Sequence, residues 1–173
     1  MALLTIDQVE KYYGAKTALT KALDQVSFSV EEGEFVGIMG ASGSGKTTLL
    51  NCIATIDTVT AGHIYLDDVD ITALPESRLA AFRQKNLGFI FQDYNLLDTL
   101  TIGENIALAP LVQGEAPSEV QRRVHSMALR LGIEDIVSKF PYEVSGGQRQ
   151  RCACARALIQ HPRLILADEP TGA

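Results

Sequence analysis

Hydrophobic and polar positions follow two regularities along this chain, one with a period of two residues and one with helical spacing. Residues 3–9 have an extended apolar pattern and residues 26–30 alternate strictly, so both are predicted to be strands with one buried face. A turn is expected at Glu32 and Gly33. Short, nearly continuous apolar runs predict further strands, the first of them covered on both faces, at 35–39, 63–66, 87–91 and 164–167.

Helical spacing fills much of the sequence between these strands. Helices are expected over 46–56, 75–84 and 145–160. The stretch 101–131 is also helical in pattern, with breaks expected at Pro110, Gly114 and Pro117 and a capping box from Ser118 to Gln121. Strands that alternate with helices predict an α/β fold, a parallel sheet covered by helices, with a largely helical insertion between about residues 95 and 140.

Composition is that of one ordinary domain and excludes several classes of function. The 173 residues are 46% hydrophobic, which is too apolar for intrinsic disorder. The net charge of −6 argues against a broad nucleic-acid interface, which is usually basic, so no nucleic-acid partner is expected. No signal peptide or membrane-spanning stretch is recognisable. An odd number of cysteines without C-x-x-C spacing fits a reducing cytoplasm and buried thiols at Cys52, Cys152 and Cys154.

A glycine-rich segment between the predicted strand 35–39 and the predicted helix 46–56 carries the first candidate chemistry. Gly40-Ala-Ser-Gly-Ser-Gly45-Lys46-Thr47 satisfies G-x-x-x-x-G-K-[ST] at every fixed position. Its glycines let the backbone amides converge on a phosphate at the positive end of the helix. Lys46 is expected to reach the β- and γ-phosphates, and Thr47 to place its hydroxyl on Mg²⁺. The candidate nucleotide ligands in this segment are Gly40, Ser42, Gly43, Ser44, Gly45, Lys46, Thr47 and Thr48.

Two adjacent carboxylates, Asp168 and Glu169, follow the predicted strand 164–167. Ligands of open parallel sheets bind outside the carboxyl ends of the strands. Neighbouring residues of a strand point in opposite directions, so the two acids are expected to have different roles. Asp168 suits Mg²⁺, and Glu169 suits the orientation or deprotonation of an attacking water.

The segment Val144-Ser-Gly-Gly-Gln148-Arg-Gln-Arg151 resembles the signature sequence of ATP-binding-cassette (ABC) ATPases, whose first residue is more often Leu. Physically, Ser145 is a helix N-cap, and two glycines leave amide donors uncovered, so this is a second anion site. In the family, two cassettes pair head to tail and each signature caps the nucleotide of the other. The resemblance therefore implies that a second cassette's nucleotide contacts Ser145, Gly146, Gly147 and Gln148.

Two further positions match the family. Gln92, directly after the strand 87–91, resembles the glutamine of the Q-loop, which contacts metal and water and senses the transmembrane partner. Tyr13, ahead of Gly14, is similar to the aromatic residue that stacks on adenine, and Tyr12 is the alternative. Either tyrosine could instead pack on the sheet.

The resemblance implies a P-loop NTPase core of the RecA-like type, an N-terminal antiparallel β subdomain and a helical insertion. It implies one ATPase domain over 1–173, divided into a β subdomain with the phosphate-loop core at 1–94, a helical subdomain at 95–144, and the signature helix with the Walker B strand at 145–173. The implied cofactors are ATP and Mg²⁺. The implied partners are a second cassette and a permease, which would hold the chain at the inner face of the membrane.

The segment 93–106, with Asn95-Leu-Leu97, Leu100-Thr101 and Glu104-Asn105, resembles the coupling region of the macrolide-export, lipoprotein-release and bacitracin-resistance exporters. The sequence ends at Thr171-Gly172-Ala173, where the family's D-loop begins. We therefore expect a truncated chain, incomplete at the C-terminus, that lacks the switch histidine; no candidate for it exists among His63, His125 and His161. A cassette that binds nucleotide without turnover stays open as an alternative. A DNA-repair or chromosome-organising ATPase is disfavoured by the acidic charge and by the lack of a coiled-coil or metal-binding insertion.

Overall fold

The computed structural model describes residues 2–14 and 19–169, and the chain divides into two compact units, Met1–Ala81 and Phe82–Ala173. Each unit is described by itself. Within the described ranges, no helix is both long and apolar enough to cross a membrane. The predicted boundaries at residues 94 and 144 stay predictions.

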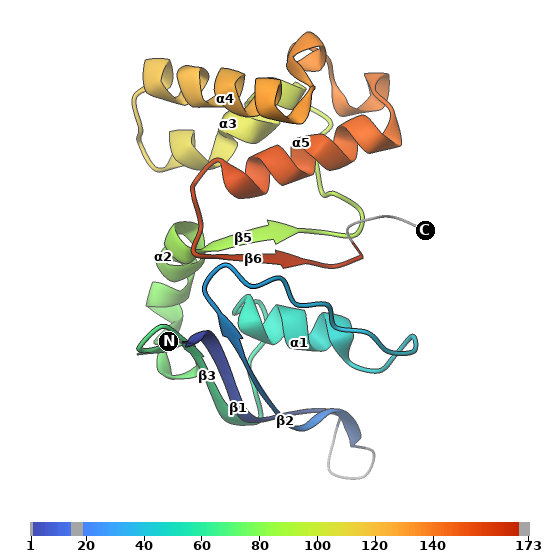
Figure 1. Cartoon of the computed structure of the whole chain (residues 1–173), viewed down its shortest axis with the longest axis vertical. Helices are drawn as coiled ribbons and strands as arrows, with labels where there is room; N and C mark the ends of the chain where they lie inside the picture. Colours follow the sequence, from blue (N-terminus) through green and yellow to red (C-terminus); the bar gives the residue numbers. More distant parts are fainter. Residues whose placement is uncertain (1, 15–18, 170–173) are drawn as a thin grey trace. The chain divides into compact units, whose positions relative to one another are not determined.

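The first unit is built on a four-stranded antiparallel sheet in the order β2-β1-β3-β4 (Figure 1). Its strands are β1 (Ala2–Tyr13), β2 (Thr20–Glu31), β3 (Ala61–Leu66) and β4 (Val69–Asp70). The apolar residues of the predicted strand 3–9, among them Leu4, Ile6 and Val9, are buried, and Ile6 pairs with Phe28 on one side and with Ile64 on the other. Helix α1 (Lys46–Ile53) lies between β2 and β3 in the sequence, and a 3₁₀ turn (Ile71–Ala73) follows β4; helix α2 (Glu76–Asn86) begins in this unit and ends in the second.

The second unit contains two parallel strands and three helices. The strands β5 (Leu87–Ile90) and β6 (Leu164–Ala167) pair with Leu87 opposite Leu164. The helices are α3 (Ile102–Val112), α4 (Pro117–Leu131) and α5 (Gly146–Leu158), with 3₁₀ turns at Glu134–Ile136 and Pro141–Glu143. Helix α5 contacts β5 as well as α3 and α4, so it lies between the strands and the other helices (Figure 1). The expected α/β fold, with an antiparallel sheet, a parallel pair and a helical insertion, is confirmed.

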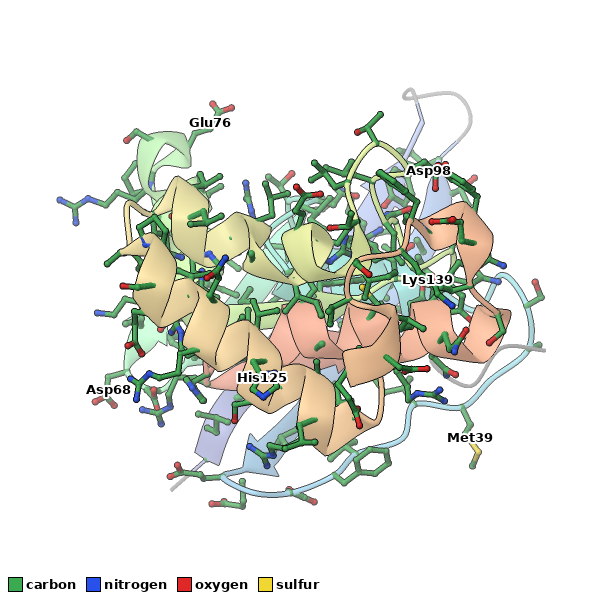
Figure 2. The ribbon with its side chains drawn as sticks, turned by 90° about the horizontal axis from the view of Figure 1, so that it is seen from above. Met39, Asp68, Glu76, Asp98, His125 and Lys139 are labelled. Atoms are coloured by element: carbon green, nitrogen blue, oxygen red, sulfur yellow. The ribbon has the colours of Figure 1, made fainter. Side chains whose placement is uncertain are left out.

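The predicted strand at 35–39 is wrong for this structure. These residues belong to neither sheet, and Phe35 and Met39 are 97% and 94% exposed. Figure 2 shows the Met39 side chain pointing away from the ribbon. A strand forms only where a neighbour supplies hydrogen-bond partners, and within residues 2–14 and 19–169 no strand pairs with this segment. An apolar run indicates a tendency to be buried, but it carries no information about the partner.

Helix boundaries also differ from expectation, and among them α2 ends at Asn86 rather than 84 and α5 at Leu158 rather than 160. Helix α1 ends at Ile53 rather than 56, because the chain turns through a left-handed Thr55. Pro110 lies inside α3, where its fully buried ring packs in the core and offsets the hydrogen bond it cannot donate. Helix α4 begins one residue before Ser118, with Pro117 in its first turn and no side-chain cap.

The cysteines behave as core residues. Cys52 and Cys152 are buried, as predicted, and burial raises the pKa of their thiols to about 11 and about 12. Cys154 is half-buried, and burial raises its pKa as well. Neutral thiols are therefore the stable form of all three at ordinary pH.

Candidate nucleotide-binding site

The phosphate loop, residues 40–47, turns into helix α1 through two left-handed glycines. Gly43 has φ +78° and Gly45, the N-cap of α1, has φ +91°. A Cβ atom on Gly45 would lie 2.3 Å from the Ala22 carbonyl oxygen of β2, so a side chain at this position would collide with backbone. The loop closes with a hydrogen bond from the Ser44 amide to the Ala41 oxygen, 3.2 Å. The first amides of an α-helix lack intrahelical acceptors, so the N-terminus of α1, which follows Gly45, suits an anion.

Lys46, the first residue of α1, directs its ammonium group back onto the loop. Its Nζ donates to the carbonyl oxygens of Gly40 and Ala41, at 2.9 and 2.8 Å. Thr47 follows with an exposed side chain, whereas the face of α1 that contains Leu49 is buried and fixes the helix. Lys46, predicted to bind phosphate, and Thr47, predicted to bind the metal, are therefore consecutive residues at the end of the glycine-rich loop.

Tyr13 ends β1 and is joined to the turn that follows α1. Its hydroxyl donates to Asp57 Oδ2 at 2.5 Å, and the Lys11 ammonium lies 4.9 Å from the ring centroid. The hydrogen bond to Asp57 and partial burial raise the pKa of the Tyr13 hydroxyl, against an opposing interaction with the Thr48 side chain. Tyr13 therefore reaches the beginning of α1.

Tyr12, the alternative to Tyr13, has different neighbours. Its hydroxyl donates to Glu10 Oε2 at 2.7 Å, and Lys21 of β2 lies over its ring. It is half-buried, whereas Tyr13 is 42% exposed. Contact with Thr48 and greater exposure make Tyr13 the better candidate for stacking on a base.

Sequence reasoning missed Lys11 and Asp57. Lys11 is only 7% exposed, and its Nζ donates to Asp57 Oδ1 and to the Thr58 carbonyl oxygen, both at 2.5 Å. The strand pattern already indicated that Lys11 is buried, because it lies two residues after the fully buried Val9 and so faces the same side of the sheet. A lysine at an inward position of a strand is rare unless a carboxylate pairs with it.

In the second unit, the ends of the parallel strands bring two predicted residues together. Gln92 Nε2, after β5, donates to Glu169 Oε2, after β6, at 2.9 Å. The Asp168 amide donates to the Ile90 oxygen at 3.0 Å, which extends the pairing of the strands by one residue. Glu169 then has φ +46°, a left-handed conformation that turns the chain out of the strand. Both members of the Gln92–Glu169 pair are exposed, so their polar atoms are accessible to solvent.

The predicted N-cap at Ser145 is confirmed. Its Oγ accepts from the Gln148 amide at 3.3 Å, and Gln148 Oε1 accepts from the Ser145 amide at 2.9 Å. Gly146 and Gly147 are exposed in the first turn of α5. The side-chain oxygen of Gln148, Oε1, is thus used within the capping box, whereas Gly146 and Gly147 are exposed to solvent.

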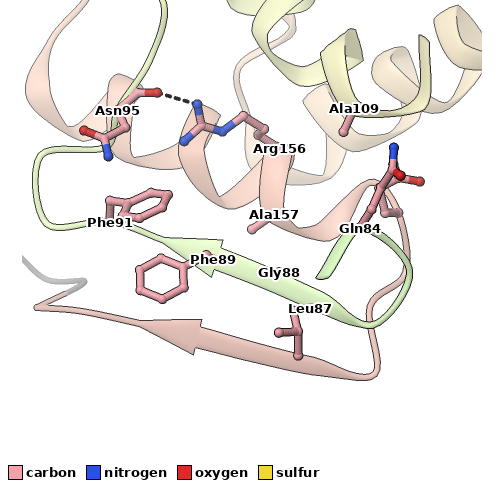
Figure 3. A pocket seen from close by; sticks show the side chains of 10 residues that line it. Gln84, Leu87, Gly88, Phe89, Phe91, Asn95, Ala109, Arg156 and Ala157 are labelled. Carbon is pink, nitrogen blue, oxygen red and sulfur yellow. Dashed lines mark hydrogen bonds between the residues drawn. The ribbon is translucent and has the colours of Figure 1, made fainter. Parts of the chain in front are cut away.

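A second feature that sequence reasoning missed is the attachment of the Q-loop, residues 92–95, to helix α5. Arg156 donates from Nη1 to the Asn95 backbone oxygen at 2.5 Å (Figure 3), and from Nη2 to the Tyr94 backbone oxygen at 2.6 Å. Tyr94 and Asn95 have φ values of +60° and +46°. Arg156 therefore holds a pair of left-handed residues two positions after Gln92.

Beside this attachment lies a pocket of about 270 Å³ (Figure 3). Its walls come from β5, the Q-loop, α3 and α5, and include Phe89, Phe91, Asn95, Ala109 and Arg156. The segment after the Q-loop is anchored by the fully buried Asn105, whose amide hydrogen bonds to backbone atoms of Leu97, Leu100 and Thr101. The coupling region predicted from sequence therefore has a fixed backbone.

The candidate residues form one set in each unit. The first unit holds Tyr13 and residues 40–48, and the second holds Gln92, Ser145–Gln148, Asp168 and Glu169. Among the residues that the structure describes, no group of three or more His, Cys, Asp or Glu side chains forms a metal site. The oxygen donors available to a divalent cation are single side chains, such as the Thr47 hydroxyl and the Asp168 carboxylate.

Known proteins resemble the chain in sequence and in structure. A family described as "ABC transporter" matches residues 23–172. ABC transporter ATP-binding protein YxdL of Bacillus subtilis is 54% identical over 98% of this chain and 66% of its own length. Bacitracin export ATP-binding protein BceA of Halalkalibacterium halodurans is 51% identical over 100% of this chain and 68% of its own length.

The same likeness extends to solved structures. A dimeric structure of the ATP-binding cassette MJ0796 bound to ADP and Pi has a TM-score of 0.89 and 37% identity, over 97% of this chain and 74% of that chain. A second dimeric structure of MJ0796 has a TM-score of 0.90. The chain spans about two thirds of the length of the curated relatives it matches.

Proposed function

Because the chain belongs to the ABC transporter family, as an ATP-binding domain, we propose that it binds and hydrolyses ATP to power a bacterial membrane transporter. The observation that carries the proposal is the phosphate loop, where left-handed glycines lead into the N-terminus of α1 and the Lys46 ammonium turns back onto the loop. That arrangement matches a polyphosphate tail in charge and shape.

The proposed binding roles follow from the positions of the side chains. Amides of the loop and of the first turn of α1 hold the β- and γ-phosphates, Lys46 neutralises their charge, and Tyr13 stacks on the base. Mg²⁺ would be held by Thr47, Asp168 and Gln92, and it would neutralise charge that develops on the transferring phosphate. Magnesium keeps several waters and is usually bound through one or two carboxylate or hydroxyl oxygens, so Thr47 of the first unit and Asp168 of the second are each a suitable donor type.

Glu169 is the proposed general base for hydrolysis. Its carboxylate orients a water, accepts one proton from it as the water oxygen bonds to the γ-phosphorus, and ADP leaves as the other product. The Gln92 amide donates to one carboxylate oxygen, at 2.9 Å, and leaves the other free to accept from the water. Gln92 thus orients the base.

The partners follow from the family. We propose a second cassette whose nucleotide contacts Ser145 and the glycine amides of α5, in a head-to-tail dimer. We also propose a permease that contacts the segment 93–106, where Leu97 is 46% exposed. This permease would hold the chain on the cytoplasmic face of the membrane. The names of the relatives, bacitracin export and macrolide export, support export of peptides, lipoproteins or antibiotics as the transport task.

Two variants test this function. Lys46→Ala is expected to abolish binding of MgATP in calorimetry, since it removes the ammonium from the phosphates. Glu169→Gln is expected to keep binding and lose phosphate release, because an amide cannot accept the proton. Unchanged affinity in the first variant, or normal turnover in the second, would contradict the assigned role. Binding without any phosphate release from the unaltered chain would favour the non-hydrolysing alternative.

A further inference from the structure

A partly buried ion pair, between the buried Lys11 and the half-buried Asp57, holds the exposed tyrosine of the proposed base site. Asp57 accepts from the Lys11 ammonium at Oδ1 and from the Tyr13 hydroxyl at Oδ2, each at 2.5 Å. The same ammonium lies 4.9 Å from the centroid of the Tyr13 ring. One carboxylate and one lysine therefore hold the tyrosine both at its hydroxyl and over its ring.

The carboxylate is itself fixed to the nucleotide-binding helix. The amides of Ile56 and Asp57 both donate to the Asn51 carbonyl oxygen of α1, at 2.9 and 3.2 Å. Farther along the same turn, the Thr60 amide donates to the backbone carbonyl oxygen of Glu10 in β1 at 2.8 Å, and the Thr60 hydroxyl accepts from the Tyr12 amide at 3.0 Å. The segment 57–60 therefore joins the end of α1 to the end of β1.

The charges of this arrangement are matched. Burial raises the pKa of the Asp57 carboxyl, but the hydrogen bonds from Lys11, Tyr13 and the Thr58 amide outweigh it and leave the pKa below its ordinary value. Asp57 is thus ionised when Lys11 is charged. A buried ammonium without this carboxylate would be costly, so the pair keeps one geometry.

We propose that Lys11 and Asp57 are positioning residues that set the Tyr13 ring as the platform on which the nucleotide base stacks. The inference rests on the proposed function, because it assumes that Tyr13 stacks on adenine. With Lys11 over the ring and Asp57 on the hydroxyl, the rotamer of Tyr13 is fixed before the base arrives. Binding then avoids the entropic cost of immobilising the side chain, which corresponds to about a two- to tenfold gain in affinity.

The test compares two ligands by calorimetry on the full chain, MgATP and magnesium tripolyphosphate. The second has the phosphates but no base, so it measures the phosphate loop alone. Asp57→Asn and Tyr13→Phe are each expected to weaken MgATP binding about two- to tenfold and to leave tripolyphosphate binding unchanged. The double variant is expected to be no weaker than the poorer single variant, because both changes break one interaction.

Glu10→Gln is the matched control, since it removes a carboxylate that holds Tyr12, the adjacent tyrosine. It is expected to leave the affinity for both ligands unchanged. A spectroscopic titration of tyrosine ionisation is the second measurement. Asp57→Asn should lower the pKa of Tyr13, because it removes the negative carboxylate that favours the neutral hydroxyl.

Tyr13→Ala separates the inference from the function on which it rests. If Tyr13→Ala weakens MgATP binding and Asp57→Asn does not, the positioning role is wrong and the base site stands. If neither variant affects MgATP binding, the base site at Tyr13 is wrong, and the positioning role is wrong with it. An equal loss of MgATP and tripolyphosphate binding in Asp57→Asn would also overturn the inference, because it would show damage to the phosphate loop instead.

Discussion

Replacing Arg156 by Met tests whether helix α5 holds the Q-loop in place. The methionine keeps much of the aliphatic stem but removes the hydrogen bonds to the Tyr94 and Asn95 oxygens, which are 2.6 and 2.5 Å long. Hydrogen bonds from a charged donor are each worth roughly 1.5–3 kcal/mol. Because Asn95 is exposed and water can replace the guanidinium there, we take the low end of this range, about 3 kcal/mol for the two bonds.

Relaxation of the released turn offsets part of this decrease in the free energy of unfolding. Tyr94 and Asn95 are left-handed, and such residues persist only where the surroundings hold them, at a cost of about 1 kcal/mol or more. Once released, the turn can relax and recover about 1 kcal/mol. The net expectation is a decrease of about 2 kcal/mol in the free energy of unfolding.

The assay is urea unfolding followed by far-ultraviolet circular dichroism, with Arg149→Met as the control. Arg149 lies on the same helix with an exposed side chain, so its replacement should change stability by less than about 0.5 kcal/mol. We also expect Arg156→Met to slow phosphate release and keep MgATP affinity, because Gln92 lies two residues before the released turn. An Arg156 variant as stable as the Arg149 control would refute this account of the Q-loop.

Three other predictions concern the core, the loop and acid stability. Asn105→Ala should lower the free energy of unfolding by about 3 kcal/mol or more, since one buried amide serves four hydrogen bonds; a loss below 1 kcal/mol in urea unfolding would contradict this. Gly45→Ala should abolish MgATP binding in calorimetry, because the added Cβ would collide with the Ala22 carbonyl oxygen. Gly114→Ala, at a position that is also left-handed but has open space for a Cβ, should lower the free energy of unfolding by only about 1–2 kcal/mol. Equal effects of the two substitutions on MgATP binding would contradict the steric argument from Ala22. The pKa of Asp70 lies below its ordinary 3.8: burial opposes this lowering, but hydrogen bonds from Thr72 and His63 outweigh it. Its contribution is therefore present above about pH 4 and is lost as pH falls below that, so Asp70→Asn should flatten the acid limb of a pH series of melting temperatures; an unchanged limb would count against it.

Sequence reasoning succeeded where the signal is local. The strict alternation at 26–30, the N-cap at Ser145 and the glycine spacing of the phosphate loop are each set by neighbouring residues, and the structure has them as predicted. The prediction of a strand at 35–39 was wrong because a strand depends on a partner that is distant in the sequence.

The side-chain contacts that hold the site could not be predicted in the same way. Lys11 and Asp57 are 46 residues apart, and Arg156 lies 61 residues from Asn95. Contacts at such separations depend on how the elements pack, which hydrophobic periodicity does not specify. The contact between Gln92 and Glu169 was within reach, because parallel strands end at one edge and both residues follow such strands.

The close approach of Gly45 to the Ala22 carbonyl links the loop to strand β2, which pairs with β1. A one-residue shift in the register between β1 and β2 would move the Ala22 carbonyl and so distort the phosphate loop that packs against it. Evolution therefore cannot vary the hairpin register and the glycine independently. In directed evolution of this cassette, substitutions that loosen the hairpin should emerge as nucleotide-affinity mutations, although they lie some twenty positions upstream of the loop.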